Sequence, residues 1–274
     1  MGSMDRRHGR EVFGADPARY HGARPGYPDW VWALLAERCG LAAGCRVFEV
    51  GAGTGIGTQE LLARGAAVTA IEPDVRLADY LEARLPSSRL EVLRRPFEHA
   101  VLPAGAFDLG CAFTSFHWLD QDEGLAAAAA ALRPGGAWAM VWNVYGDPER
   151  ADAFHDATLE IMRTPEESPS AGLAGRVPFA LDVEVRRTDL RAAGFVDVDV
   201  GRESWTLELD PAGVRALYAT YSPVARLEPE ARARLLDGVA DVAEREFGGR
   251  VERNMVTIAY TARVPQEPRP SSDR

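Results

Sequence analysis

Three glycines at alternate positions form the chemical motif around which the sequence is organised. Gly51, Gly53 and Gly55 follow the apolar run at residues 47–50 and precede an apolar, helix-compatible segment that begins at Ile56. Glycine has no Cβ, so the backbone can turn sharply there and approach a bound ligand closely. A helix that begins behind such a turn points its N–H groups at the ligand. The pattern therefore predicts a strand, a tight turn and a helix that together bind a polar or anionic group.

The spacing of these glycines argues against two common nucleotide-binding motifs. The dinucleotide fingerprint needs glycine at the first, third and sixth positions of the turn, and counting from Gly51 the sixth position is Ile56. A phosphate-binding loop needs a lysine after its last glycine, but all 31 basic residues of this chain are arginine. An NAD-type pyrophosphate site is therefore disfavoured, and a nucleoside-triphosphate site of that motif is excluded.

The glycine turn resembles a known motif when the acid before it is included. Glu49-x-Gly51-x-Gly53-x-Gly55 is similar to motif I of the class I S-adenosylmethionine-dependent methyltransferases, in which the loop passes under the methionine part of the cofactor. The resemblance implies S-adenosylmethionine as cofactor and S-adenosylhomocysteine as product. It also implies that the loop residues contact the cofactor: Glu49, Gly51, Ala52, Gly53, Thr54 and Gly55.

A second landmark of that family follows the next predicted strand. Residues 67–71 form an apolar run that ends at Glu72-Pro73, where the family has an acid that binds both ribose hydroxyls of the cofactor. A carboxylate can accept two hydroxyl hydrogen bonds at once, and charged acceptors form the stronger ones. The resemblance therefore implies that Glu72 binds the ribose, with Pro73 beside it.

The segment ahead of the first predicted helix carries another resemblance. Residues 20–28 have the form Tyr-x-x-x-Arg-Pro-x-Tyr-Pro, which in these methyltransferases folds over the cofactor. This implies that Tyr20 and Tyr27 shield the sulfonium and that Arg24 helps to hold a carboxylate. A packed turn ahead of the helix is the alternative interpretation.

Two further segments complete the expected cofactor site. Phe97 and Glu98 follow the predicted strand 90–93 at the place where family members flank the adenine, although the more common aspartate is absent. Residues 106–113 form the next predicted strand, and its end places side chains in the ligand crevice of such a sheet. The resemblance implies three cofactor contacts there and one catalytic residue, a histidine that could equally cap the next helix. The contacts are Phe113, Thr114 and Trp118, and the catalytic residue is His117.

The elements that position these residues alternate strictly as far as residue 142. Helices are expected at residues 30–38, 56–62, 73–85 and 122–132, and a fifth strand at 138–142. Such alternation predicts an α/β fold, a Rossmann-like and mostly parallel seven-stranded sheet with helices on both faces.

The alternation fails after Asn143. Helices are expected at residues 147–162, 183–193, 211–221 and 229–247, a loop at 164–174, and strands at 195–200, 204–207 and 255–260. Material inserted late in such a sheet normally covers the ligand crevice, which predicts a helical substrate lid. The expected organisation is a cofactor-binding core at 5–145, remaining strands plus lid at 146–264, and a disordered tail at 265–274.

Composition restricts the partners and the compartment. The formal charge is −10 and no run of arginines is long, so nucleic acid is not expected. The longest apolar stretch, residues 125–132, is too short to span a bilayer, and the N-terminus, with an apparent expression scar at 1–3, shows no apolar core of a signal peptide. We therefore expect a cytoplasmic protein, monomeric or homodimeric, with no membrane partner. Three unpatterned cysteines indicate reduced core thiols, and five scattered histidines give no metal motif.

The resemblance implies methyl transfer from S-adenosylmethionine to a small organic molecule, in biosynthesis. The acceptor atom stays open among carboxylate, hydroxyl, amine and activated carbon. The resemblance is greatest to the branch that contains trans-aconitate-type and other small-molecule methyltransferases. Two alternatives stay open: a cofactor-binding protein of the same fold that acts as a cyclase or a non-methylating binder, and an NAD-dependent dehydrogenase in which Glu72 holds a ribose.

Overall fold

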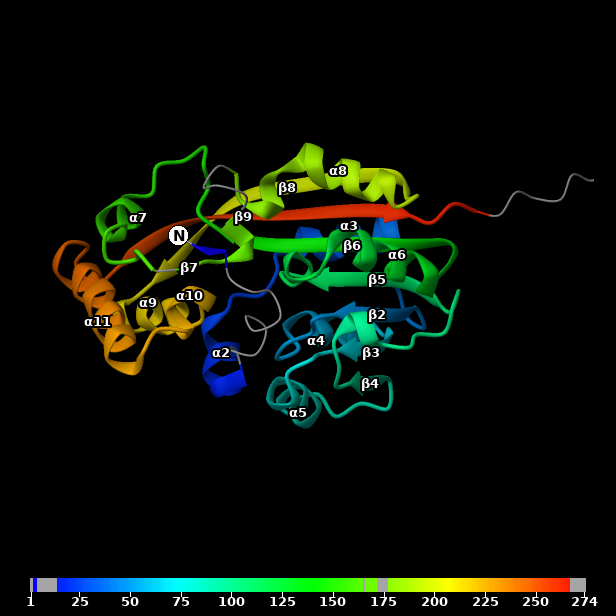
Figure 1. The fold of residues 1–274 in the computed structure, drawn as a ribbon, viewed down its shortest axis with the longest axis horizontal. Helices are drawn as coiled ribbons and strands as arrows, with labels where there is room; N and C mark the ends of the chain where they lie inside the picture. Colours follow the sequence, from blue (N-terminus) through cyan, green and yellow to red (C-terminus); the bar gives the residue numbers. More distant parts are fainter. Residues whose placement is uncertain (1, 4–13, 165, 172–176, 267–274) are drawn as a thin grey trace, which may run out of the picture.

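A seven-stranded sheet with the order β4-β3-β2-β5-β6-β9-β8 organises the molecule (Figure 1). The computed structural model describes residues 2–3, 14–164, 166–171 and 177–266. The strands are β2 (Arg46–Val50), β3 (Ala67–Ile71), β4 (Leu90–Leu93), β5 (Phe107–Phe113), β6 (Leu132–Tyr145), β8 (Val196–Leu209) and β9 (Val251–Arg263). All pairs from β4 to β6 are parallel, and β9 is antiparallel to both β6 and β8. The predicted fold class is therefore confirmed.

Helices cover both faces of this sheet. They are α2 (Pro17–Ala23), α3 (Asp29–Cys39), α4 (Ile56–Ala63), α5 (Val75–Arg84), α6 (Gln121–Ala131), α7 (Ala153–Thr158), α8 (Val183–Ala192), α9 (Pro211–Tyr218), α10 (Ser222–Ala225) and α11 (Pro229–Arg245). A small parallel pair, β1 (Gly2–Ser3) with β7 (Glu166–Glu167), lies apart from the main sheet. Among the described residues, no helix combines the length and apolar character that a membrane span requires.

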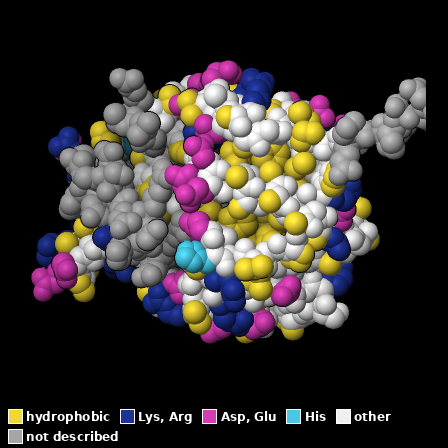
Figure 2. Space-filling view, turned by 45° about the vertical axis from the view of Figure 1, so that its right-hand side comes forward, with side chains coloured by type: hydrophobic (Ala, Val, Ile, Leu, Met, Phe, Trp, Pro, Cys, Tyr) yellow, Lys and Arg dark blue, Asp and Glu magenta, His cyan; other side chains and the backbone are white. Residues whose placement is uncertain are grey.

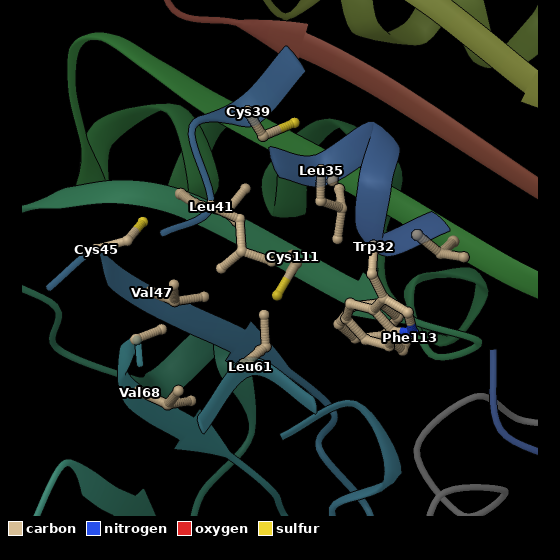
Figure 3. Close-up of a cluster of buried hydrophobic side chains, with 14 of the residues drawn as sticks. Trp32, Leu35, Cys39, Leu41, Cys45, Val47, Leu61, Val68, Cys111 and Phe113 are labelled. Carbon is tan, nitrogen blue, oxygen red and sulfur yellow. The ribbon is translucent and has the colours of Figure 1, made fainter. Parts of the chain in front are cut away.

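The central strands are apolar on both sides because both of their faces are buried. On β2, Val47 packs in a cluster with side chains of α3 and α4, whereas Phe48 packs in a second cluster with α6 and β6. Figure 3 shows the first cluster, which contains Val47, Leu61 of α4 and Cys111 of β5. Continuous apolar runs are typical of such doubly covered parallel strands.

The three cysteines lie in this first cluster. Cys39, Cys45 and Cys111 are unpaired and buried (Figure 3). Burial raises the pKa of the Cys39 thiol to about 12 and also raises the pKa of Cys45 and Cys111. Thiols with a raised pKa carry little thiolate at neutral pH and are chemically inert. The predicted reduced core thiols are confirmed.

The late part of the chain differs most from the predicted elements. Of the helix expected at 147–162, the structure forms only α7, because Asp152 accepts a hydrogen bond from His155 N and caps the helix there. Asp147 instead contacts β8, where its carboxylate accepts a hydrogen bond from Ser204 Oγ at 2.7 Å. The strands expected at 195–200 and 204–207 are one strand, β8, with a bulge after Val196.

Two smaller differences concern the last elements. The helix expected at 211–221 ends at Tyr218, and a separate short helix, α10, begins at Ser222 with Pro223 in its first turn. The final strand β9 is longer than the predicted 255–260 because it pairs along most of its length with both β6 and β8. The expected tail overlaps residues 267–274, and part of the expected loop overlaps 165 and 172–176; both lie outside the described residues.

The late helices gather at one end of the sheet. Figure 1 shows α7, α9, α10 and α11 together with α2 beyond the end at which the parallel strands finish. A third buried cluster, which includes Phe154, Tyr218 and Val239, joins α7, α9 and α11 to β9. These helices therefore have an apolar core of their own that is anchored on the sheet.

Candidate active site

A cavity of about 620 Å³ lies between the carboxyl ends of the central strands and the late helices. Ligands of open α/β sheets bind at this edge. The cavity brings together fifteen residues that the sequence singled out: Tyr20, Arg24, Tyr27, Glu49, Gly51, Ala52, Gly53, Thr54, Glu72, Pro73, Phe97, Phe113, Thr114, His117 and Trp118.

The glycine turn has the backbone that only glycine adopts readily. Gly51, Gly53 and Gly55 have φ angles of 67°, 57° and 83°, all in the left-handed region. A Cβ at Gly51 would lie 2.6 Å from Ser115 Cβ, so a side chain is excluded there. A Cβ at Gly53 would meet no heavy atom within 4 Å, and Gly53 lines the cavity. The turn therefore leaves room for a ligand against its backbone.

Glu72 fixes the turn to the end of β3. Its Oε2 accepts a hydrogen bond from Gly53 N at 2.8 Å and its Oε1 accepts one from Asp74 N at 2.9 Å. The residue is 4% exposed, so the carboxylate is held in place at the cavity wall. A carboxylate accepts about four hydrogen bonds, and two backbone donors do not exhaust that capacity. The position fits a pair of hydroxyl groups.

Glu49 is the second carboxyl group of the cavity, and it is buried at the end of β2. Thr58 Oγ1 donates to its Oε2 at 2.5 Å. Burial raises the pKa of Glu49 to about 8, against the lowering effect of the Thr58 hydrogen bond and with a further increase from Glu72. Glu49 is thus mostly protonated at neutral pH. Gly57 makes room for it, because a Cβ there would lie 2.6 Å from Glu49 Oε1.

The segment that follows α2 closes over the glycine turn. Tyr27 OH forms a hydrogen bond with Thr114 Oγ1 at 2.8 Å, and its ring lies 5.0 Å from that of Phe113. His21 Nδ1 and Thr54 Oγ1 are 3.0 Å apart, which links α2 directly to the turn. The segment therefore lines the cavity, and its role as a cover over a bound cofactor stays a prediction.

Arg24 points toward the late helices. Its Nη2 donates to Thr220 O at 2.9 Å. Its guanidinium carbon lies 5.2 Å from the ring centres of Tyr20 and Tyr145 and 5.6 Å from that of Tyr221. We call this group of three rings the tyrosine cage. Each distance is within the range of a cation–π interaction.

Comparisons with known proteins agree with this geometry. A model of the methyltransferase domain matches residues 48–140. The chain is 31% identical over 166 residues to an uncharacterized methyltransferase of Geobacillus kaustophilus, across 56% of this chain and 74% of that protein. The chain belongs to the class I S-adenosylmethionine-dependent methyltransferases. It is also 34% identical over 135 residues to an uncharacterized methyltransferase of Mycobacterium tuberculosis, across 48% of this chain, and spans about half (51%) of that relative.

Solved structures share the fold of this methyltransferase at low identity. Haemonchus contortus phosphoethanolamine N-methyltransferase 2, in complex with phosphomonomethylethanolamine and S-adenosylhomocysteine, has a TM-score of 0.59 at 15% identity, over 94% of this chain and 60% of that one. The cyclase SpnF has a TM-score of 0.55 at 21% identity, over 89% of this chain and 85% of that one. At these identities the likeness shows the fold alone.

Two predicted cofactor residues of the methyltransferase do not line the cavity. Gly55 is the N-cap of α4, and a Cβ there would lie 3.0 Å from Leu81 Cγ, on the side of the core. The short 3-10 helix Phe97–His99 turns Phe97 inward, where its ring stacks on Phe48, and leaves Glu98 exposed. The structure therefore places Phe97, but not Glu98, at the cavity.

His117 lies at the cavity wall in a defined hydrogen-bonding state. Trp142 Nε1 donates to His117 Nδ1 at 3.1 Å, so the Nδ1 lone pair is engaged and the neutral ring carries its proton on Nε2. In this state His117 is a hydrogen-bond donor from Nε2. A role as general base would require this bond to open, and the catalytic assignment of His117 stays a prediction.

Several cavity residues were not predicted from the sequence. They come mostly from the late part of the chain: Trp142, Asn143, Tyr145, His155, Phe179 and Tyr221. Asn143 is a buried residue near the carboxyl end of β6, and the rule that singled out His117 at the end of β5 applies to it as well. Its amide is hydrogen-bonded through both polar atoms, with Nδ2 donating to Gly26 O and Oδ1 accepting from Thr257 Oγ1. The late aromatic residues carry no local signal.

Among the described residues, no group of three or more His, Cys, Asp or Glu side chains could hold a metal ion. On the face shown in Figure 2, acidic side chains gather beside an area of hydrophobic side chains, and the arginines lie in separate small groups.

Proposed function

We propose that the protein transfers a methyl group from S-adenosylmethionine to a small organic molecule. The single observation that carries this proposal is the shared cavity: the glycine turn and Glu72 form one half of it, and side chains of the late elements form the other. A cofactor held by the first half would present its reactive end to the second. The family membership of the chain supports the same reading.

The residues present fit the cofactor. The open space at Gly53 would admit the methionine part, and the fixed carboxylate of Glu72 would accept the ribose hydroxyls. The remaining predicted contacts would come from Tyr20, Arg24, Tyr27, Glu49, Gly51, Ala52, Thr54, Pro73, Phe97, Phe113, Thr114 and Trp118. When bound, S-adenosylmethionine supplies an electrophilic methyl group on its sulfonium.

The work of the protein is then to place the acceptor. A well-oriented nucleophile in line with the S–CH3 bond gains roughly 7–11 kcal/mol from positioning alone. The walls from the late elements, such as Trp142, Tyr145 and Phe179, would orient the acceptor and exclude water. We infer that residues 146–264 carry acceptor specificity in this way. The cytoplasmic location, the biosynthetic role and a monomeric or homodimeric state stay predictions.

The test is transfer of an isotopically labelled methyl group. The purified protein is incubated with methyl-labelled S-adenosylmethionine and a panel of carboxylates, phenols, amines and activated carbon acids. We expect one class to gain label with equimolar formation of S-adenosylhomocysteine. Tight cofactor binding without a methylated product from any class would contradict the proposal.

A second candidate function is a reaction that uses the cofactor without consuming it. The structural likeness to the cyclase SpnF over 89% of this chain favours it as the alternative. The two candidates differ in one readout. A cyclase would turn over with S-adenosylhomocysteine in place of S-adenosylmethionine, whereas a methyltransferase would stop.

A further inference from the structure

Arg186 is a buried arginine with few polar partners. It lies on α8, is 6% exposed, and its Nη2 is 2.8 Å from Asp189 Oδ2. Its Nε and Nη1 are buried and have no hydrogen-bond partner among the described residues. Burial of a charge is costly, and one ion pair seldom offsets the loss of its hydration. A further favourable contact of this guanidinium is therefore expected.

That contact is the ring of Phe179. The guanidinium carbon of Arg186 lies 3.7 Å from the ring centre, which places the cation over one face of the ring. Phe179 begins the 3-10 helix Phe179–Leu181, and the hydroxyl of Tyr260 fixes this helix to β9 by donating to Ala180 O at 2.6 Å. Phe179 lines the cavity and Arg186 does not. The cation therefore holds the ring from the side away from the cavity.

Phe179 is also the most accessible ring of a group of three at the cavity wall. Its ring centre lies 5.8 Å from that of Trp142 and 6.2 Å from that of His117. Trp142 is 2% exposed and His117 is 4% exposed, whereas Phe179 is only partly buried. Because Arg186 covers one face of the ring and the ring lines the cavity, the opposite face is the one available to a ligand.

The surroundings of this face suit an uncharged apolar molecule. Many other lining residues of the late elements are apolar or aromatic, such as Met162 and Val224. The carboxyl groups among the described lining residues are Glu49 and Glu72, and both belong to the half of the glycine turn. A cationic acceptor would therefore find no carboxylate on the late elements that surround it.

The position of Arg186 restricts the charge of a ligand further. The face of an aromatic ring attracts a cation. At Phe179 a cation of the protein already occupies one face, so a second cation on the cavity side would be repelled across the ring. An uncharged aromatic ring has no such penalty and gains the contact between two rings.

We propose that the methyl acceptor is an uncharged aromatic compound whose ring packs on the cavity face of Phe179. Arg186 is then a positioning residue, because it touches Phe179 and not the acceptor, and it holds the phenyl ring for this contact. This inference rests on the proposed methyl transfer and names the class of its acceptor.

The experiment compares matched ligands on the protein saturated with S-adenosylhomocysteine, so that the cofactor half is occupied. The probes are 2-naphthalenemethanol, its saturated analogue decahydro-2-naphthalenemethanol, and the cation 2-naphthalenemethylamine. Calorimetry and ligand-detected NMR measure their affinities. We expect the aromatic alcohol to bind about fivefold or more tightly than each of the other two. Equal or tighter binding of the saturated alcohol or the amine, or no binding of the aromatic alcohol, would overturn the inference.

Variants test whether Phe179 and Arg186 are the source of this preference. Phe179→Leu keeps an apolar side chain without the ring and should abolish the preference for the aromatic over the saturated alcohol. Arg186→Met removes the charge and should reduce the same preference, and Arg186→Lys, which keeps a cation, should restore part of it. Arg191→Met, at an exposed position on α8, is the matched control and should change no affinity.

A merely structural role of Arg186 predicts a different result. It would weaken all three ligands by the same factor and leave their ratio unchanged, which would refute the positioning role. Thermal unfolding checks that each variant is folded. If Arg186→Met does not fold, Phe179→Leu and Arg186→Lys still decide the inference.

The order of the measurements separates this inference from the proposed function. Binding of S-adenosylhomocysteine to the wild-type protein is measured first. If it binds and the aromatic preference is absent, the inference alone is wrong. If it does not bind, the three ligands are titrated into the protein alone, and a preference that Phe179→Leu abolishes would support the ring contact while the proposed methyl transfer is wrong.

Discussion

Replacement of Glu72 by alanine tests the cofactor half of the cavity. The carboxylate of Glu72 accepts hydrogen bonds from Gly53 N and Asp74 N and is 4% exposed. Glu72→Ala removes the group that would accept the ribose hydroxyls and also releases the glycine turn from β3. Both consequences should weaken binding of S-adenosylhomocysteine.

The expected size of the loss follows from the charge of the acceptor. A hydrogen bond to a charged group contributes about 1.5–3 kcal/mol. Loss of one such contribution to the ribose raises the dissociation constant about 10- to 150-fold, since 1.4 kcal/mol corresponds to a factor of ten. The two backbone donors left behind cost stability as well, about 1–3 kcal/mol each, toward the lower value because water can enter the cavity.

Calorimetric titration with S-adenosylhomocysteine measures the first effect, and urea unfolding of the ligand-free protein measures the second. Glu91→Gln, on the exposed side of β4, is the control and should change neither. A change in the dissociation constant of less than threefold for a folded Glu72→Ala protein would refute the placement of the ribose at Glu72.

Four further predictions follow from the described contacts. Gly53→Val should fold with a loss of about 1–2 kcal/mol, because its φ of 57° is left-handed but its Cβ position is open, and should not bind S-adenosylhomocysteine in a calorimeter; retained binding would contradict this. His117→Ala should lower turnover in the labelled-methyl assay while cofactor affinity stays nearly unchanged; an equal loss of both would indicate a packing role. The folded-state pKa of Glu49 is raised from 4.5 to about 8, so the folded protein binds more protons between these values and its stability falls as pH rises through that window. Urea unfolding of Glu49→Gln from pH 5 to 8 should lack this fall, and parallel curves for variant and wild type would refute it. Asp152→Ala should cost about 3–5 kcal/mol in urea unfolding, because it leaves the buried Arg253 without its carboxylate partner at 2.8 Å; a loss below 1 kcal/mol would contradict this.

The first half of the fold was predictable because its signals are local. Strands β2 to β5 are short and mostly apolar, and the residue that follows the strand is a glycine for β2, an acid for β3 and a threonine for β5, whereas an arginine follows β4. The helices between these strands, α4 and α5, begin and end within two residues of their predicted bounds. The central strands β2 and β5 are buried on both faces, so their sequences are mostly apolar and predict strands without a polar–apolar alternation.

The late part was less predictable because its boundaries depend on distant contacts. α7 begins where it does because the carboxylate of Asp152 is fixed by Arg253 of β9, about a hundred residues away. β8 is only partly buried and its pattern is broken at Gly201, where a Cβ would lie 2.9 Å from the Trp30 ring. Neither constraint is visible in a local window of sequence.

The candidate site also has a part that local sequence signals predict and a part that they do not. The glycine turn and Glu72 follow strand ends, and the edge of a parallel sheet brings strand ends together. The tyrosine cage, in contrast, joins Tyr20, Tyr145 and Tyr221, which meet only because the late helices fold back over the sheet. The half of the cavity around the glycine turn could therefore be predicted from the sequence, but the half formed by the late elements could not.

The central claim is that this cavity binds S-adenosylmethionine through the glycine turn. The most direct measurement is calorimetric titration of the wild-type protein, freed of any co-purified nucleotide, with S-adenosylhomocysteine and, separately, with NAD. We expect one molecule of S-adenosylhomocysteine to bind with a micromolar dissociation constant and NAD to give no heat. Saturation by NAD with no response to S-adenosylhomocysteine, from a protein shown to be folded, would contradict the claim.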